Sequence, residues 1–522
     1  MAGYAPTAAR SIRPLCFACI LTVLAICSIV LPGREHIDTR RRLTPSGGSA
    51  AAKLLGAATE YTLLPEWVSP KPSCFVHPND WSKCAGDHML YPAASKEALL
   101  ARDNMCLHEP LCWKQLDWKD TLPPTKPCKS QPAKDLRFYD MSYHDFTMGA
   151  AATAIEKSLN ADTGKHHEVF LCNCKKARAT ISNYKYQYKL CPTNKGLECS
   201  WKTPYSDARA AANYENYHND AHFMGTDALI FGFGSAMWEH WMAVNKTLVL
   251  NLDHRVNQHR CTEQASKAIF NKLRYLASAG DERHVIGAQN IYDVEYVRHY
   301  TGIHPVYLPP TLYDALAGLT WKQTRTEFTW IGNKEFPIPA PLVNSKKYKF
   351  LKPNHAGHYD LKDLTGYAGA VLFPYSISAG KVMEQYGMNI PIFAPSVELA
   401  KTMVNDRTAT YMPYCPGLRD GDLHAHPSSP YAYSPNVRMD SNGPGVADDV
   451  KFWIGFAEIY LLPCVTYFST WEELEELIDS TDRVVVSRCM QRANLWRHFE
   501  EIQNWCWAAS YVGSKGAAAP PQ

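Results

Sequence analysis

Residues 369–396 carry the sequence GAVLFPYSISAGKVMEQYGMNIPIFAPS. The apolar run 370–373 predicts a buried strand, and the loop of small residues PYSISAG follows it directly. Residues 381–386 then have helical spacing, and residues 390–393 predict the next strand. A strand, a loop, a helix and a second strand in this order predict a parallel β-α-β unit whose sheet is covered on both faces.

The same alternation extends outward from this unit. Upstream, strands are predicted at 136–139, 168–172, 227–232, 246–252, 284–288 and 306–308, and helices at 145–159, 236–242, 261–279 and 293–300. After Pro309-Pro310 the pattern restarts, with strands at 327–331, 348–351, 370–373 and 390–393, and a further helix at 397–405. We therefore predict an α/β fold of two Rossmann-like domains, 131–310 and 311–480.

The remaining C-terminal segments differ in texture. Residues 413–449 form a Pro/Gly/Ser loop that is longer than compact domains usually contain. Residues 449–512 are rich in Trp and predict helix, and we assign 481–522 as a helical tail. An aromatic stripe (Trp496, Phe499, Trp505, Trp507) has helical spacing, which favours core packing over a sugar-stacking platform.

Two segments carry a family resemblance. Residues 284–302, HVIGAQNIYDVEYVRHYTG, lead to Leu308-Pro309 and resemble the end of the N-terminal domain of GT-B glycosyltransferases. Residues 369–396 resemble the donor-binding segment of that fold, in the form also seen in exostosin-like enzymes, and residues 449–477 are similar to its terminal segment. The resemblance covers about 135–510 and implies a glycosyltransferase that uses a nucleotide-sugar donor, without naming the sugar.

The resemblance implies a donor site after the strand 370–373. Ser376, Ser378 and Gly380 would offer hydroxyls and amides to a diphosphate, and Lys381 would add positive charge. Glu384 would accept hydrogen bonds from ribose hydroxyls. The competing interpretation makes Glu384 an ordinary exposed helix residue and the two serines helix caps.

The acceptor side is expected in loops of the first domain. Asp140 and His144 follow the first strand, where GT-B enzymes commonly place a catalytic base, and both are candidates for removing the acceptor's proton. Asp145 is better explained as a helix cap, and His144 has the alternative of an ordinary surface histidine. His254 and Arg255 follow the strand 246–252 and are candidate phosphate or acceptor contacts.

No metal or cofactor is predicted beyond the nucleotide-sugar co-substrate. The D-x-D at 420–422 and the H-x-H at 424–426 have ligand chemistry, but they lie in the Pro/Gly loop rather than at a strand end. The turn Gly232-Phe-Gly234-Ser235 lacks the third glycine of a dinucleotide fingerprint. A net charge of +3 over 522 residues gives no basic field for nucleic acid.

The N-terminus predicts a membrane anchor. Residues 15–31, LCFACILTVLAICSIVL, are uncharged and would extend about 25 Å as a helix, enough for a thin bilayer. A cleaved signal peptide is the alternative, although no small-x-small site follows directly. We predict a cytosolic tail at 1–14, an anchor at 15–32, and a stem with a disulfide-rich region at 33–130.

Cysteine usage predicts an oxidising lumen. Of 17 cysteines, three (Cys16, Cys19, Cys27) lie in the apolar run, which leaves 14, and no pair has the CxxC spacing. An even number behind a membrane segment indicates disulfides, with Cys172 and Cys174 expected in separate bridges to Cys191 and Cys199. Asn245 begins a glycosylation sequon. The expected location is the Golgi or endoplasmic reticulum membrane, as a single-pass type II protein.

The expected partners are a nucleotide-sugar donor, a glycan or glycoprotein acceptor, and the membrane, with no nucleic acid. Two other functions stay open at this point. A lumenal sulfotransferase would share the anchor and the disulfides, but the sequence has no Gly-x4-Gly-Lys-Ser/Thr loop. A non-catalytic carbohydrate-binding protein would keep the fold without needing the nucleotide.

Overall fold

The structure is a computed structural model, and it describes residues 111–128, 132–142, 145–172, 189–191, 206–233, 238–242, 246–253, 256–257, 262–277, 284–314, 316, 318–332, 338–352, 360–373, 380–405, 425–426, 429 and 454–515. The chain divides into two compact units, Met1–Gly48 and Ser49–Gln522. All described residues lie in the second unit. The predicted tail and anchor at 1–32 and most of the stem region therefore lie outside the described residues.

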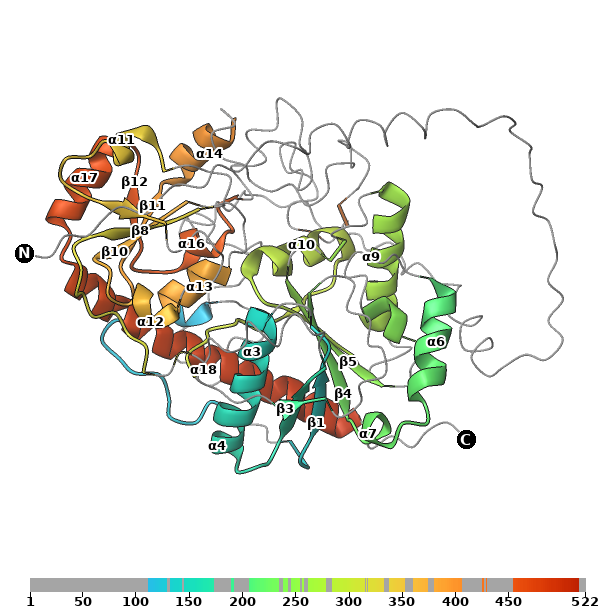
Figure 1. Cartoon of the computed structure of the whole chain (residues 1–522). Coiled ribbons are helices and arrows are strands. Elements are labelled where there is room, and N and C mark those ends of the chain that lie inside the picture. Colours follow the sequence, from blue (N-terminus) through green and yellow to red (C-terminus); the bar gives the residue numbers. More distant parts are fainter. Residues whose placement is uncertain are drawn as a thin grey trace, which may run out of the picture. The chain divides into compact units, whose positions relative to one another are not determined.

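The first sheet is parallel throughout. Its strands are β1 (Arg137–Asp140), β2 (Glu168–Leu171), β3 (Lys189–Leu190), β4 (Ala228–Phe233), β5 (Thr247–Asp253), β6 (Val285–Ala288) and β7 (Val306–Tyr307). They are ordered β3-β2-β1-β4-β5-β6-β7 (Figure 1). This order, which runs outward in both directions from the β1/β4 pair, is the arrangement of a doubly wound Rossmann sheet.

Short helices connect these strands. They are α3 (Asp145–Thr153), η3 (Ala154–Leu159), α4 (Asn160–Thr163), α6 (Asp207–Tyr217), α7 (Ala221–Met224), η5 (Glu239–Trp241), α9 (Glu263–Ala277) and α10 (Ile291–Thr301). The ends of α10 show why it forms here. The Asn290 side chain accepts a hydrogen bond from the Asp293 amide at 2.8 Å, and Gly302 ends the helix at φ 74°, a conformation that glycine adopts without a steric cost.

The second sheet is also parallel and smaller. Its strands are β8 (Phe328–Ile331), β9 (Phe350–Leu351), β10 (Gly369–Leu372), β11 (Ile392–Pro395) and β12 (Thr466–Phe468), in the order β12-β11-β10-β8-β9. Its helices are α11 (Ala340–Val343), α12 (Leu361–Leu364), α13 (Gly380–Gly387), α14 (Val397–Asn405), α16 (Glu458–Leu461) and α17 (Trp471–Ser480). The strand order reverses its direction between β8 and β10, so this sheet is doubly wound as well.

Each sheet buries both faces, as the sequence predicts. On β10, Ala370 and Leu372 belong to one hydrophobic cluster, whereas Val371 and Phe373 belong to another. In the first sheet, Phe138 on β1 and Leu136 before it pack in a third cluster. The largest cluster contains residues from both sheets, so the two sheets share one continuous apolar core. The prediction of an α/β fold with parallel, two-sided sheets is confirmed.

A single long helix, α18 (Arg483–Lys515), contributes to the cores of both sheets. Met490 and Ala493 join the largest cluster, while Trp505 and Val512 pack against the first sheet in the cluster of Phe138. Its polar side chains make matching contacts. Asn494 donates to the Tyr386 carbonyl of α13 at 2.7 Å, and Asn504 donates to the Tyr307 carbonyl of β7 at 2.7 Å.

Residues 111–128 form a strap along α18, which includes the short helix η2 (Cys112–Gln115). The Leu111 amide and the Trp113 indole donate to the two carboxylate oxygens of Glu500, at 2.6 and 3.1 Å. Trp113 also stacks on Trp496. A disulfide joins Cys128 to Cys506. The end of the predicted disulfide-rich region therefore packs on the helix that both sheets share.

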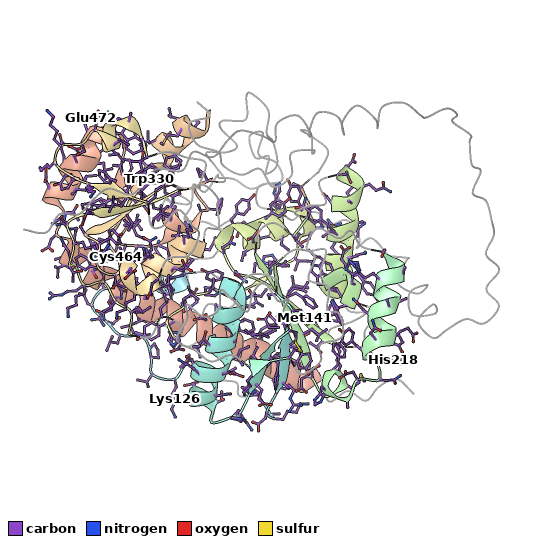
Figure 2. The ribbon with its side chains drawn as sticks, viewed as in Figure 1. Lys126, Met141, His218, Trp330, Cys464 and Glu472 are labelled. Carbon is purple, nitrogen blue, oxygen red and sulfur yellow. A yellow bond between two sulfur atoms is a disulfide. The ribbon has the colours of Figure 1, made fainter. Side chains whose placement is uncertain are left out.

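Two further disulfides are present, Cys172–Cys191 and Cys464–Cys489; Cys464 is labelled in Figure 2. The first confirms one of the two predicted pairings, and Cys174 and Cys199 lie outside the described residues. None of the described helices is long and apolar enough to cross a membrane. The predicted anchor at 15–32 is not tested by this result.

The prediction that 449–512 is helical is wrong in one place. Residues 466–468 form β12, which pairs in parallel with β11 and completes the second sheet. The run Val-Thr-Tyr-Phe at 465–468 is β-branched and aromatic, and it follows Pro463, so the local preference is for a strand. The tryptophans on either side obscured this signal. The aromatic stripe of α18 is core as predicted, with Trp496, Phe499 and Trp505 buried.

Candidate functional site

Doubly wound sheets bind ligands beyond the carboxyl ends of their strands, at the place where the strand order turns around. In the first sheet this place lies between β1 and β4, and in the second between β8 and β10. The predicted acceptor residues follow β1, and the predicted donor segment follows β10. Of the predicted residues that the structure describes, Asp140 ends β1, and Gly380, Lys381 and Glu384 lie in the helix that follows β10.

Asp140 is the last residue of β1, and Met141 directly after it is labelled in Figure 2. The carboxyl group is completely buried. Oδ1 accepts a hydrogen bond from the Ser142 amide at 2.9 Å, whereas Oδ2 has no hydrogen-bond partner within the part of the chain that the structure describes. Burial raises the pKa of this carboxyl to about 6, against the lowering effect of its hydrogen bonds from Ser142.

A carboxyl group in this state has the properties of a general base. Its pKa of about 6 lies just below neutral pH, so the group is mostly ionised at pH 7 and is a stronger base than an ordinary carboxylate. Its second oxygen is desolvated and is not committed to another described group. The neighbouring backbone is fixed, because the Met141 amide donates to the Ile230 carbonyl of β4 at 2.8 Å.

The donor side is described only in part. Gly380, Lys381 and Glu384 lie in the first turns of α13 and are half-buried, so the predicted helix is confirmed. The inner face of α13 is apolar and buried through Val382, Met383 and Tyr386. This leaves Lys381 and Glu384 on the more accessible side. Ser376 and Ser378 lie outside the described residues.

The other predicted site residues are not described either. His144, His254, Arg255 and the sequon residue Asn245 fall in gaps of the described ranges. Their proposed roles stay predictions. Of the H-x-H motif, His426 is described, and its amide donates to the His299 carbonyl of α10 at 2.7 Å. No group of three or more His, Cys, Asp or Glu side chains arranged for a metal exists among the described residues.

A second buried polar cluster was not predicted. Glu458 of α16 is 5% exposed, and Arg497 of α18 is fully buried on the ring of Tyr386. Burial raises the pKa of Glu458 to about 7, although Arg497 lowers it, and Asp293 adds to the increase. Among the described residues, Glu458 Oε1 and Arg497 Nε have no hydrogen-bond partner. The only sequence signal was one carboxylate inside the apolar run 454–462.

Comparisons with known proteins give a structural likeness only. No protein-family model matches the sequence, and no curated protein matches it. Among solved structures, the chain is similar to the glycosyltransferase SnogD from Streptomyces nogalater, with 11% identity and a TM-score of 0.37 over 73% of this chain and 100% of that one. A glycotransferase of kitacinnamycin matches at 10% identity and a TM-score of 0.36, over 72% and 98%.

A third solved structure is the S. aureus MnaA-UDP co-structure, at 10% identity and a TM-score of 0.32 over 73% of this chain and 94% of that one. At these scores the likeness carries no argument about this chain. The fold is established by the strand order of the two sheets.

Proposed function

We propose that this protein is a GT-B glycosyltransferase that moves a sugar from a nucleotide-sugar donor to a hydroxyl group of a glycan or glycoprotein acceptor. The observation that carries the proposal is Asp140, a buried carboxyl with one oxygen available at the point where the first sheet turns around. The order of the second sheet, with its donor segment after β10, supports the same function. The exostosin-like character of 369–396 remains part of the proposal.

The proposed chemistry uses the residues as follows. Asp140 Oδ2 accepts the proton of the acceptor hydroxyl while its oxygen forms a bond to the anomeric carbon of the donor sugar. The bond from that carbon to the diphosphate oxygen breaks, and the nucleoside diphosphate leaves with the electron pair. Ser376, Ser378, Gly380 and Lys381 would bind the diphosphate, and Glu384 would accept hydrogen bonds from the ribose. His144, His254 and Arg255 would complete the acceptor and phosphate contacts.

Two variants test the separate roles of Asp140 in proton transfer and Glu384 in nucleotide binding. We expect Asp140→Asn to lower sugar transfer by about 100-fold or more, because the amide cannot accept the proton, while nucleotide binding is retained. We expect Glu384→Ala to weaken nucleotide binding with the fold intact. The measurement is a thermal shift of the full chain with UDP, GDP, CMP and 3′,5′-bisphosphorylated adenosine, followed by transfer assays with the matching donor sugars.

Glu398→Ala is the matched control, since Glu398 is an exposed glutamate in the first turn of the next helix, α14. A shift with the bisphosphorylated adenosine alone would favour the sulfotransferase. The absence of a thermal shift with all four nucleotides would contradict the proposal and favour the carbohydrate-binding alternative, whereas full transfer by Asp140→Asn would contradict the role of Asp140 as the base.

The proposal includes a location in the secretory pathway, as a single-pass type II protein of the Golgi or endoplasmic reticulum membrane. Three disulfides among the described residues support an oxidising compartment. The apolar segment 15–31 supports the membrane attachment. Mapping of oxidised cysteines in protein taken from cells tests the compartment.

A further inference from the structure

Ser142 connects the two strands at the turning point of the first sheet. It is 1% exposed, and its amide donates to Asp140 Oδ1 at 2.9 Å. Its hydroxyl also hydrogen-bonds the Asp140 carboxylate. The same hydroxyl oxygen accepts the Gly232 amide of β4 at 2.5 Å. One small side chain therefore joins the end of β1, the Asp140 carboxylate and the backbone of β4.

The chemistry of a hydroxyl group makes this contact directional. A serine hydroxyl has one proton to donate and two lone pairs that accept. The Gly232 amide occupies one lone pair of this hydroxyl and leaves its proton to be donated, and a hydrogen bond from the Ser142 side chain lowers the pKa of the Asp140 carboxyl. The amide and the hydroxyl of Ser142 thus both donate to the Asp140 carboxylate, and they hold it in one orientation at the end of β1. Oδ2 is the oxygen that remains for a ligand.

We propose that Ser142 is a positioning residue for Asp140, which it clamps through Oδ1 so that Oδ2 is presented to the acceptor hydroxyl. The hydrogen bonds of Ser142 to Asp140 do not depend on the reaction, but their catalytic purpose rests on the proposed function. Alignment of this kind matters because a base must lie within hydrogen-bond reach of the proton that it removes.

Two variants separate the clamp from a general effect on folding. Ser142→Ala removes one hydrogen bond to the carboxylate, so the pKa of Asp140 should rise by about one unit. Transfer should fall about tenfold even at a pH above both pKa values, with the KM for the acceptor unchanged. Ser142→Thr keeps the hydroxyl and should restore both properties. Ser266→Ala is the matched control, because Ser266 is a buried serine of α9 that accepts from Asn257 at 3.0 Å.

The titration of Asp140 is measured by carbon-13 NMR of the full chain labelled at its aspartate carboxyls, with the Asp140 signal assigned by its loss in Asp140→Asn. An increased pKa in Ser142→Ala, a normal one in Ser142→Thr and no change in Ser266→Ala are the expected results. If the alanine variant does not fold, Ser142→Cys keeps the volume with a weaker donor and should give a smaller increase in the same direction.

The two proposals fail in different ways. A wild-type Asp140 titration in both Ser142→Ala and Ser142→Cys would overturn the clamp, even if Asp140→Asn were inactive. An increased pKa in Ser142→Ala, combined with full transfer by Asp140→Asn, would instead overturn the proposed role of Asp140 as the base, and with it the catalytic purpose of the clamp. A pH-rate profile of Ser142→Ala whose acid limb moves with the measured pKa would support both.

Discussion

At the scale of single residues, the buried carboxyl of Glu458 stands out because one of its oxygens, Oε1, has no hydrogen-bond partner among the described residues. Burial is the largest influence on its pKa, which rises from 4.5 to about 7. Arg497 opposes this increase, but its Nε atom has no hydrogen-bond partner in the described part of the chain. The folded protein therefore holds a proton on Glu458 that the unfolded chain releases above pH 4.5.

The stability of the protein should depend on pH through this residue. Since the pKa is higher in the folded state, the contribution of Glu458 is present below pH 4.5 and is lost as the pH rises to about 7. Glu458→Gln mimics the protonated form, so its unfolding free energy should exceed that of the wild type by about 3 kcal/mol at pH 8 and equal it at pH 4.5. Urea unfolding at both values measures this, with Glu398→Gln as the exposed control. Equal differences at the two values would contradict it.

At the scale of elements, α18 is the part on which most of the fold depends. Asn494 is buried near its middle, where its amide group donates to the Tyr386 carbonyl and to Asn389 Oδ1 at 2.9 Å. Its own Oδ1 accepts from Arg497 at 3.1 Å. Asn389 lies two residues beyond the end of α13 with φ 59°, a left-handed conformation that asparagine tolerates better than most residues. The two asparagines thus join the end of α13 to α18.

Removing this junction should destabilise the protein strongly. Asn494→Ala removes three buried hydrogen bonds, although the Tyr386 carbonyl still accepts from the Asn389 amide, and we expect a loss of about 2–4 kcal/mol in unfolding free energy. Gln491→Ala is the control, because Gln491 is exposed on the same helix and its substitution should change stability by less than about 0.5 kcal/mol. Denaturant unfolding of both variants measures these changes in unfolding free energy. A similar small effect in both would show that the contacts of Asn494 contribute little.

The elements were predictable to the extent that their patterns are local. Strands β1, β5 and β10 follow from apolar runs, and α10 from its cap and its terminal glycine. The strand β12 was hidden within a tryptophan-rich segment. The sharing of α18 between two cores depends on contacts far apart in the chain, which no local pattern contains.

At the scale of the whole molecule, disulfides indicate the chemical environment in which the protein folds. Cys128 and Cys506 are separated by 378 residues, and their bond closes almost the entire described chain into one loop. A bond that closes so long a loop restricts the unfolded state strongly, by up to about 5 kcal/mol. A reducing compartment would remove this contribution.

Protein isolated from cells after its free thiols have been blocked should contain Cys128–Cys506 and Cys464–Cys489 as oxidised pairs, because the proposed compartment is oxidising. Peptide mapping by mass spectrometry measures this. The control is a Cys506→Ser variant, in which the Cys128 peptide should carry the blocking group. Blocked Cys128 and Cys506 in the wild-type protein would contradict the proposed location.

The part of the candidate site that depends only on the order of strands was predictable from the sequence. Asp140 was identified from its place after a strand, and the structure adds its burial and its available oxygen. The clamp by Ser142 was not predictable, since it depends on an amide of β4, 90 residues further along the chain. Glu458 and Arg497 were not foreseen because their meeting likewise requires the folded chain.

The strap at 111–128 also has a consequence for biosynthesis. A ribosome adds about 5–20 residues per second, so Cys506 emerges roughly 20–75 seconds after Cys128. At the same rates of synthesis, Cys191 emerges at most about four seconds after Cys172. Throughout the longer interval the Cys128 thiol is without its native partner, and Trp113 has no Trp496 to stack upon. The strap therefore docks only after α18 has been synthesised, and any early, local pairing of Cys128 has to be undone before the native disulfide can form.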